Sequence, residues 1–319
     1  MVLGKFLPPH AGHQYLIDFA KEYVDDLTLV VGTLAAEPIA GELRYAWMKE
    51  LYEGAGVRVV HLDQELPQEP KEHPQFWDLW QAALRPLVPK KLDFVFASED
   101  YGHRLAAVLG AEFIPVDVNR TAIPVSGTAI RQHPFDHWQY LPHCVKAHYV
   151  RRVCVFGPES TGKSTLTQEL ATHYRATAVP EYARAVIEHQ NGELCSADML
   201  RIAKGQAASE DALARSANRL LFCDTDLLTT TIWSDWLFNE CDPWIQKQGI
   251  QRRYALTLLL DVDVPWVKDQ VRFLPNDRRN FFDLCETRLR EHDRPYVILT
   301  GNWAQRRAKA IQAIDKLLQ

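Results

Sequence analysis

The 319-residue sequence has no apolar run approaching the roughly 20 residues that a membrane-spanning helix requires. It also lacks the basic start, apolar core and cleavage site of a secretory signal, so we expect a cytoplasmic protein with no membrane partner. The six cysteines form no CxxC pair, and we expect small buried side chains rather than disulfides or a zinc site. The net charge of -5 argues against a broad nucleic-acid-binding face.

One segment that is present, GPESTGKS at residues 157–164, matches the phosphate-binding pattern GxxxxGKS. It lies between an apolar run at 153–156 and a helical stretch at 163–174, which is the strand, loop and helix context that the pattern requires. Lys163 is expected to reach the β- and γ-phosphates of ATP, and Ser164 to offer its hydroxyl to Mg²⁺. The remaining ATP-binding candidates of this loop are Gly157, Glu159, Ser160, Thr161, Gly162 and Thr165.

A second loop, GKFLPPHAGH at residues 4–13, places His10 and His13 at the start of a helix. Imidazoles at a helix N-terminus can donate hydrogen bonds to a phosphate where the helix dipole also favours negative charge. The expected apolar stripe of that helix is Leu16, Phe19, Ala20 and Tyr23.

The segment VSGTAIR at residues 125–131 offers hydroxyls, free N–H groups and a guanidinium to the same phosphates. In isolation it is equally consistent with a polar helix start and a solvated arginine. The ATP-binding candidates of this half are Gly4, Lys5, Phe6, Ser126, Gly127, Thr128 and Arg131.

Short β-rich runs alternate with helical stretches along the chain in two series. The expected strands are residues 1–3, 27–31, 57–60, 94–97 and 113–116, and then 153–156, 176–179, 220–223, 256–260 and 296–299. This alternation predicts an α/β protein with parallel sheets and ligands at the carboxyl ends of the strands. We expect domains at residues 1–135 and 152–319, the second a P-loop kinase by length and strand count, with a linker at 136–151.

Two acids of the second half are candidates for phosphoryl-transfer chemistry. Asp224 ends an apolar strand, which is the position that puts a carboxylate beside the magnesium of a phosphate loop. Glu181 follows the strand candidate 176–179 and is the candidate base for the acceptor hydroxyl. The alternative for Glu181 is an acid that favours the dipole of the following helix.

Two further groups of residues carry an open alternative. Arg272, Arg278 and Arg279 follow the fourth strand of the second half, where a lid can close over the transferred phosphoryl group, although a solvated basic face fits as well. Tyr182, Trp233 and Trp236 are candidates for stacking on an aromatic acceptor, although large aromatics at helical spacing are usually core residues.

Taken together, these motifs resemble a known pairing. GKFLPPHAGH with VSGTAIR is similar to nucleotidylyltransferases of the HxGH class, and GPESTGKS followed by PEYAR at residues 180–184 resembles the ribosylnicotinamide kinase domain of the bifunctional NadR proteins. The resemblance covers essentially the whole chain. It implies a Rossmann-like nucleotidylyltransferase domain followed by a P-loop kinase domain.

The resemblance also implies two reactions. The kinase half would phosphorylate nicotinamide riboside with ATP to nicotinamide mononucleotide (NMN), and the other half would join NMN to ATP to give NAD and pyrophosphate. The resemblance places His10 and His13 on the phosphates of ATP, with Ser126, Thr128 and Arg131 on the β- and γ-phosphates. Together with the candidates from the second half, the expected catalytic residues are His10, His13, Arg131, Lys163, Glu181 and Asp224, with Mg²⁺ on Ser164 and Asp224. The SEDYG segment at residues 98–102 places Ser98, Glu99 and Tyr101 at the mononucleotide, and PEYAR adds Tyr182 and Arg184 at the riboside, beside Trp233.

Some members of the family carry an N-terminal DNA-binding domain, but only three residues precede Gly4 here, so no nucleic-acid partner is expected. A homo-oligomer is left open. Two rival interpretations are a coenzyme A pathway adenylyltransferase and kinase fusion, and a nucleotide-sensing regulatory protein with one inactive site. The PEYAR and SEDYG segments disfavour the first rival, and the intact lysine and acids disfavour the second.

Overall fold

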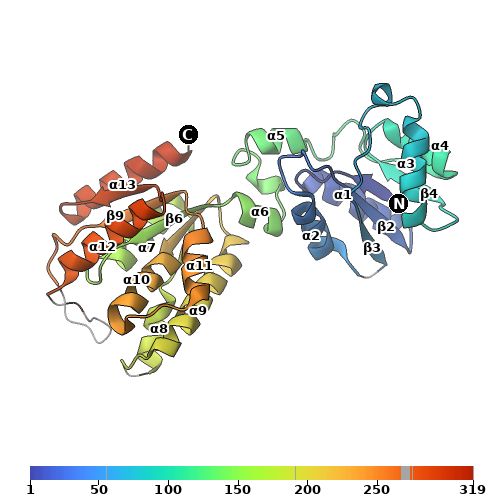
Figure 1. The fold of residues 1–319 in the computed structure, drawn as a ribbon. Helices are drawn as coiled ribbons and strands as arrows, with labels where there is room; N and C mark the ends of the chain where they lie inside the picture. Colours follow the sequence, from blue (N-terminus) through green and yellow to red (C-terminus); the bar gives the residue numbers. More distant parts are fainter. Residues whose placement is uncertain (55, 191, 267–273, 275, 319) are drawn as a thin grey trace. The chain divides into compact units, whose positions relative to one another are not determined.

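The computed structural model describes residues 1–54, 56–190, 192–266, 274 and 276–318. It divides into one unit at Met1–Val145 and another at Lys146–Gln319. Each unit is built around its own five-stranded sheet, in which every pair of neighbouring strands is parallel (Figure 1). The predicted α/β class with parallel sheets is therefore confirmed.

The first unit has the strand order β3-β2-β1-β4-β5. Its strands are β1 (Val2–Gly4), β2 (Leu27–Gly32), β3 (Val57–Leu62), β4 (Phe94–Ala97) and β5 (Glu112–Pro115). Its helices are α1 (Ala11–Tyr23), α2 (Gly41–Tyr52), α3 (Phe76–Leu84), α4 (Tyr101–Leu109), α5 (Gly127–Gln132) and α6 (His143–Tyr149), the last of which extends past the boundary between the units. The direction of winding reverses between β1 and β4, so a crevice is expected beyond their carboxyl ends.

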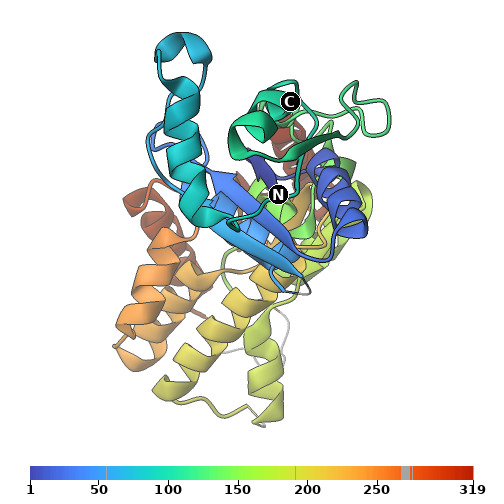
Figure 2. The same cartoon turned by 90° about the vertical axis from the view of Figure 1, so that its right-hand side faces the viewer.

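Two apolar cores cover the two faces of this sheet. Side chains of α1 and α2, including Ile17 and Met48, pack with Leu29 and Val31 on one face. Side chains of α3 and α4 pack with Leu3, Val30 and Val95 of the strands on the opposite face. Figure 2 shows α1 and α3 on opposite sides of the blue strands. The loops after β1 and β4, which carry two of the sequence motifs, therefore emerge at the same edge of a rigid sheet.

The second unit has the strand order β10-β9-β6-β8-β7. Its strands are β6 (Arg151–Phe156), β7 (Thr177–Val179), β8 (Leu220–Asp224), β9 (Leu256–Leu260) and β10 (Tyr296–Leu299). Its helices are α7 (Lys163–Tyr174), α8 (Tyr182–His189), α9 (Ser196–Ala214), α10 (Leu227–Phe238), α11 (Pro243–Gln251), α12 (Arg278–Glu291) and α13 (Trp303–Leu318).

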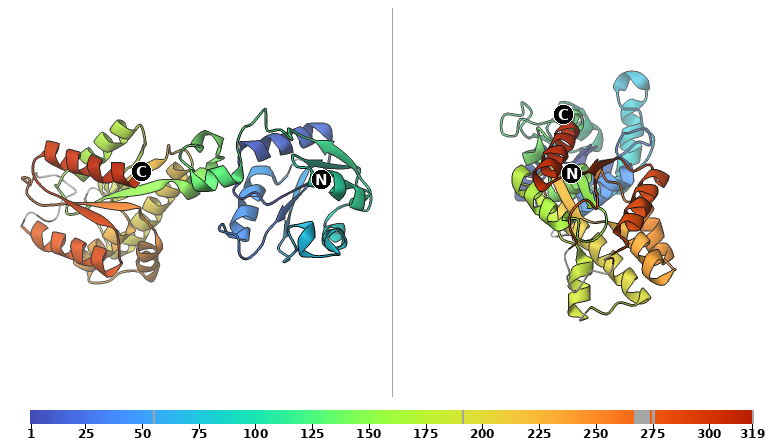
Figure 3. Two further views of the ribbon diagram at one scale, coloured as in Figure 1. Left: turned by 90° about the horizontal axis from the view of Figure 1, so that it is seen from above. Right: turned by 90° about the vertical axis from the view of Figure 1, so that its left-hand side faces the viewer.

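Strand β6 is the central strand of this sheet, between β8 and β9. Helices α7 and α13 cover one face of the sheet (Figure 3). Their residues Leu170 and Ile314 belong to the apolar core on that face. Helices α8, α9, α10 and α11 form a second apolar cluster. The loop after β6 therefore leaves the middle of the sheet, where the carboxyl ends of the neighbouring strands surround it.

Two sequence-based expectations about burial were wrong. Tyr23 is 50% exposed rather than part of the buried stripe of α1, where Ile17 takes its place, and its ring lies at the edge of the core against Phe94 and Phe96. Cys195, at the N-cap of α9, is exposed and Cys241 is only partly buried, whereas the other four cysteines are buried as expected. Within the described ranges, no helix has the length and apolarity needed to cross a bilayer.

Candidate active sites

The first candidate site begins with two stacked histidines at the start of α1. His10 is the N-cap residue, and its Nδ1 accepts a hydrogen bond from the Gly12 N–H at 3.1 Å. Because Nδ1 is an acceptor, a neutral His10 carries its proton on Nε2. The ring of His13 stacks on that of His10 at 3.8 Å, and Phe6 meets His13 edge-on at 5.0 Å. Both imidazoles are thereby held in one orientation.

Burial keeps both imidazoles uncharged near neutral pH. It lowers the pKa of His10 to about 4, and the charge of Arg120 acts in the same direction. It also lowers the pKa of His13 well below its usual value, with His10 and Arg120 as smaller causes. The His13 Nδ1 is buried and has no hydrogen-bond partner among the described residues. The pair can therefore offer neutral N–H donors to an anion.

The SGTAIR segment lies against the histidine loop, although the contacting residues Arg131 and Leu7 are 124 positions apart in the sequence. The Arg131 guanidinium donates a hydrogen bond to the Leu7 carbonyl, and another to the Thr128 hydroxyl at 3.1 Å. A Cβ at Gly127 would lie only 2.6 Å from the Leu7 carbonyl oxygen, so this close approach requires glycine. Ser126 caps α5 by accepting the Ala129 N–H at 3.2 Å.

A buried ion pair, which the sequence motifs did not indicate, supports the Gly4-Lys5-Phe6 turn. The Arg44 side chain is fully buried and pairs with Glu37. It donates hydrogen bonds to the carbonyl of Lys5 at 2.6 Å and to that of Ile39 at 3.1 Å. The Lys5 ammonium lies 3.1 Å from Glu37 Oε1. The one signal in the sequence was an arginine at an inward position of α2, three residues before Trp47.

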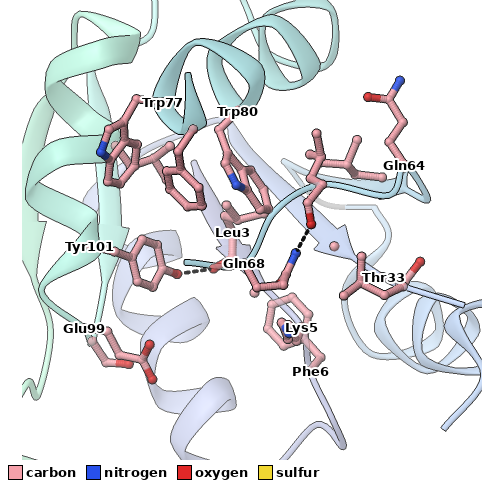
Figure 4. Close-up of a pocket in the computed structure, with 18 of the residues that line it drawn as sticks. Leu3, Lys5, Phe6, Thr33, Gln64, Gln68, Trp77, Trp80, Glu99 and Tyr101 are labelled. Atoms are coloured by element: carbon pink, nitrogen blue, oxygen red, sulfur yellow. Dashed lines mark hydrogen bonds between the residues drawn. The ribbon is translucent and has the colours of Figure 1, made fainter. Parts of the chain in front are cut away.

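A cavity of about 370 Å³ opens beside these groups (Figure 4). Its walls include Gly4, Lys5, Phe6, His13, Ser98, Glu99, Tyr101, Trp77 and Trp80. Tyr101 is fixed by a hydrogen bond from its hydroxyl to the Leu3 carbonyl at 2.9 Å. Trp77 and Trp80 project together from α3 into the cavity, and sequence reasoning had not singled them out. The cavity thus joins the histidine loop, the SEDYG segment and an aromatic wall.

The second candidate site is the loop between β6 and α7. Gly157 and Gly162 adopt φ values of +130° and +89°, which L side chains rarely adopt. Lys163 begins α7, and its ammonium donates a hydrogen bond to the Pro158 carbonyl at 2.9 Å. The buried Thr161 hydroxyl donates to the same carbonyl at 2.8 Å. The loop is therefore wrapped around its own lysine.

The start of α13 holds this loop from outside, which the sequence motifs did not indicate. Arg306 is buried and donates hydrogen bonds to the carbonyls of Thr161 at 2.9 Å, Gly301 at 3.0 Å and Asp261 at 3.0 Å. The indole of Trp303 fills the space beside Gly162, where a Cβ would come within 2.2 Å of the ring.

Two carboxylates face the lysine from the ends of neighbouring strands. Burial raises the pKa of Asp224, against the charge of Lys163 and a hydrogen bond with Ser164. The Oδ1 atom of Asp224 is buried without a hydrogen-bond partner in the part of the chain that the structure describes. Burial likewise raises the pKa of Glu181, which Lys163 and Arg184 lower and Asp224 raises further. The charges of Lys163 and Arg184 therefore act on both carboxyl groups and oppose the effect of burial on their pKa values.

A cavity of about 270 Å³ lies between α8, α9, α10 and the loop. Its polar wall includes Glu159, Ser160, Gly162, Lys163, Ser164, Thr165, Glu181, Arg184, Gln206 and Thr225, and its apolar wall includes Ile187, Leu194, Met199, Ile202 and Trp233. Trp233 also packs on Phe281 with 4.3 Å between ring centroids, so it is both a wall and a core residue. Tyr182 lies outside this lining, and its ring covers Gly205.

The arginines expected in a lid differ in their surroundings. Arg272 lies outside the described residues. Arg278 donates hydrogen bonds to the Ser160 carbonyl at 3.3 Å and to the Val264 carbonyl at 3.0 Å, so it reaches the phosphate loop. Arg279 forms a pair with Asp261 at 2.7 Å. Of the two described arginines, Arg278 therefore contacts the loop, and Arg279 is paired with Asp261 just after β9.

Comparisons with known proteins agree with this geometry. A family described as "AAA domain" matches residues 152–306. The chain is 32% identical over 320 residues to the trifunctional NAD biosynthesis/regulator protein NadR of Escherichia coli K12, covering 93% of this chain and 77% of that protein. It is 30% identical over 342 residues to the protein of the same name from Salmonella typhimurium LT2, covering 100% and 83%.

Two solved structures share the fold over almost the full length. A NadR protein in complex with NR matches with a TM-score of 0.82 at 24% identity, covering 99% of this chain and 95% of that one. A NadR protein in complex with NAD and AMP-PNP matches with a TM-score of 0.81 at 25% identity and the same coverage.

Proposed function

This chain belongs to the NadR family and is an enzyme of NAD biosynthesis, and we propose how its two units divide the work. The second unit transfers the γ-phosphoryl group of ATP to nicotinamide riboside, giving NMN and ADP. The first unit transfers the adenylyl group of a second ATP to NMN, giving NAD and pyrophosphate. The observation that carries the proposal is that each of two phosphate-binding loops opens onto its own cavity.

In the adenylyl transfer, an NMN phosphate oxygen attacks the α-phosphorus of ATP in line, and the bond to the β-phosphate oxygen breaks. No covalent enzyme intermediate is needed, so the protein acts by positioning and by stabilising charge. We assign His10 Nε2 as a donor to the triphosphate. His13 and Lys5 on the cavity wall add donors, and so does Arg131, whose guanidinium lies at the Leu7 carbonyl outside the lining of the cavity. Trp77 and Trp80 provide an aromatic wall for the acceptor ring.

In the phosphoryl transfer, the 5′-hydroxyl of the riboside attacks the γ-phosphorus, its proton passes to Glu181, and ADP leaves. Lys163 and Arg278 stabilise the charge on the transferred group. Glu181 must be ionised to accept the proton, and the neighbouring charges of Lys163 and Arg184 favour that form against the effect of burial. The apolar wall with Trp233 receives the base of the riboside.

The second site also fits a magnesium ion. Asp224 Oδ1 is a buried acceptor that has no partner among the described residues, and the Ser164 hydroxyl lies beside this carboxyl group. Hard oxygen donors of this kind suit Mg²⁺, which takes few protein ligands and several waters. We assign Ser164 and Asp224 as its ligands. When bound, Mg²⁺ neutralises charge on the β- and γ-phosphates.

Product analysis tests the proposal directly. Purified protein is mixed with ATP and MgCl₂, once with nicotinamide riboside and once with NMN, and the products are separated by chromatography. NMN that is converted onward to NAD is expected in the first mixture, and NAD with pyrophosphate in the second. NAD from the second mixture alone would refute the assignment of the kinase unit.

We also propose that the enzyme works in the cytoplasm and binds no nucleic acid.

A further inference from the structure

The kinase cavity contains a buried amide that has no part in the reaction proposed above. Gln206 lies on α9, is 1% exposed and lines the cavity. Its Oε1 accepts the backbone N–H of Tyr182 at 2.9 Å, at the start of α8. Its Nε2 is buried and has no hydrogen-bond partner among the described residues. A buried donor without a partner is costly, so such a group commonly indicates an unseen partner.

The chemistry of the contact fixes the orientation of the amide. A backbone N–H can only donate, so the atom that faces Tyr182 must be the carbonyl oxygen of Gln206. The NH₂ group therefore occupies the other position, and both of its hydrogens need acceptors. Thr225, on the same cavity wall, likewise has a buried hydroxyl oxygen without a partner in the described chain. The cavity wall thus carries two buried polar groups without partners among the described residues.

The position of Gln206 along α9 indicates which part of an acceptor it meets. Met199, Ile202 and Gln206 follow one another at helical spacing and all line the cavity. Ile202 and Met199 lie about 6 Å and 10 Å from Gln206 along the helix axis, at 1.5 Å per residue. The apolar base fits near those two residues. The amide lies beside the start of α8, next to Glu181. Glu181 meets the 5′-hydroxyl, which is part of the ribose, so the amide is expected to lie beside the ribose rather than the base.

We propose that the Gln206 amide donates a hydrogen bond to a secondary hydroxyl of the acceptor ribose, and so makes the kinase site selective for a ribonucleoside. This inference rests on the proposed phosphorylation of nicotinamide riboside. Gln206 thereby performs two tasks with one side chain, since its oxygen holds the start of α8 and its nitrogen holds the sugar. The same amide therefore positions Glu181, at the start of α8, and the ribose that carries the 5′-hydroxyl.

The test compares nicotinamide riboside with its 2′-deoxy and 3′-deoxy analogues, using kcat/KM for phosphorylation by the full-length enzyme. For the wild type, the analogue that lacks the recognised hydroxyl should react about 3- to 10-fold less efficiently, which is the effect of one hydrogen bond. In the Gln206→Met variant, the riboside and that analogue should react with equal efficiency. A role limited to holding α8 would lower all rates and leave the ratio between substrates unchanged.

Gln251→Met is a matched control because Gln251 is exposed at the end of α11, and it should keep the wild-type ratio. Wild-type enzyme that phosphorylates both deoxy analogues as efficiently as the riboside would overturn the inference without any variant. So would a substrate ratio that persists in Gln206→Met. Absence of riboside turnover by the wild type would instead refute the proposed kinase function, and this inference with it.

Discussion

Replacing Arg44 by methionine should destabilise the first unit and weaken adenylylation. The substitution keeps much of the buried side-chain volume but removes the charge that pairs with Glu37 and the hydrogen bonds to Lys5 and Ile39. Removing one partner of a buried ion pair typically costs about 3–5 kcal/mol. Glu37 keeps the ammonium of Lys5 at 3.1 Å and the N–H of Leu34 at 2.9 Å, so we expect the lower end, about 3 kcal/mol.

Urea denaturation and scanning calorimetry measure this loss. For a unit of this size, about 3 kcal/mol corresponds to a fall in the melting temperature of roughly 6–12 °C. Arg104→Met, on the exposed surface of α4, is the control and should change neither stability nor activity. The double variant Arg44→Met with Glu37→Gln should lose less than the sum of the single losses, because no unpaired buried charge remains and the ammonium of Lys5 is half-exposed to solvent. Additive losses would refute the assignment of a coupled buried pair.

Further predictions separate the two units and their pH responses. Lys163→Ala should lower phosphorylation at least about 100-fold and spare adenylylation, and His13→Ala should do the reverse; loss of both activities in either folded variant would contradict independent sites. The pKa of His10 is lowered from 6.5 to about 4, so its contribution to stability is present above pH 6.5 and is lost as the pH falls toward 4. Glu210 on α9 is fully buried and accepts a hydrogen bond from the hydroxyl of Tyr254. Burial raises its pKa from 4.5 to about 7, so its contribution to stability is present below pH 4.5 and is lost as the pH rises through 7. Urea unfolding between pH 4 and 7.5 measures both effects. His10→Gln should reduce the rise of the unfolding free energy with pH, and Glu210→Gln should reduce its fall. A pH dependence equal to that of the wild type in either variant would contradict the corresponding assignment.

The sequence was most informative where structure is determined locally. The strands at residues 94–97, 256–260 and 296–299 and the helix at 163–174 lie where periodicity and the glycine loop predicted them. The short first strand also forms, because β2 and β4 pair with it on both sides. Tyr23 shows the limit of periodicity, since a helix stripe predicts which way a side chain points but not where the sheet ends.

The supporting residues escaped sequence reasoning because their partners are distant in the chain. Arg44 meets Lys5 across 39 residues, Gln206 meets Tyr182 across 24, and Arg306 meets Thr161 across 145. No motif spans such distances, and each of these residues alone is an ordinary polar residue of a helix. Trp77 and Trp80 likewise become cavity walls only in the folded unit, where they line the same cavity as Leu3 and Gly4 at the end of β1.

The contact between Arg306 and Thr161 also has a consequence for the order in which the protein matures. The phosphate loop is complete only when α13 has arrived, 145 residues after Thr161. At about 5–20 residues per second, a ribosome needs roughly 7–29 s to synthesise that interval. The adenylylating unit can fold during this time, because its motifs all precede residue 146. The nascent chain would therefore become competent to make NAD from NMN before it can make NMN.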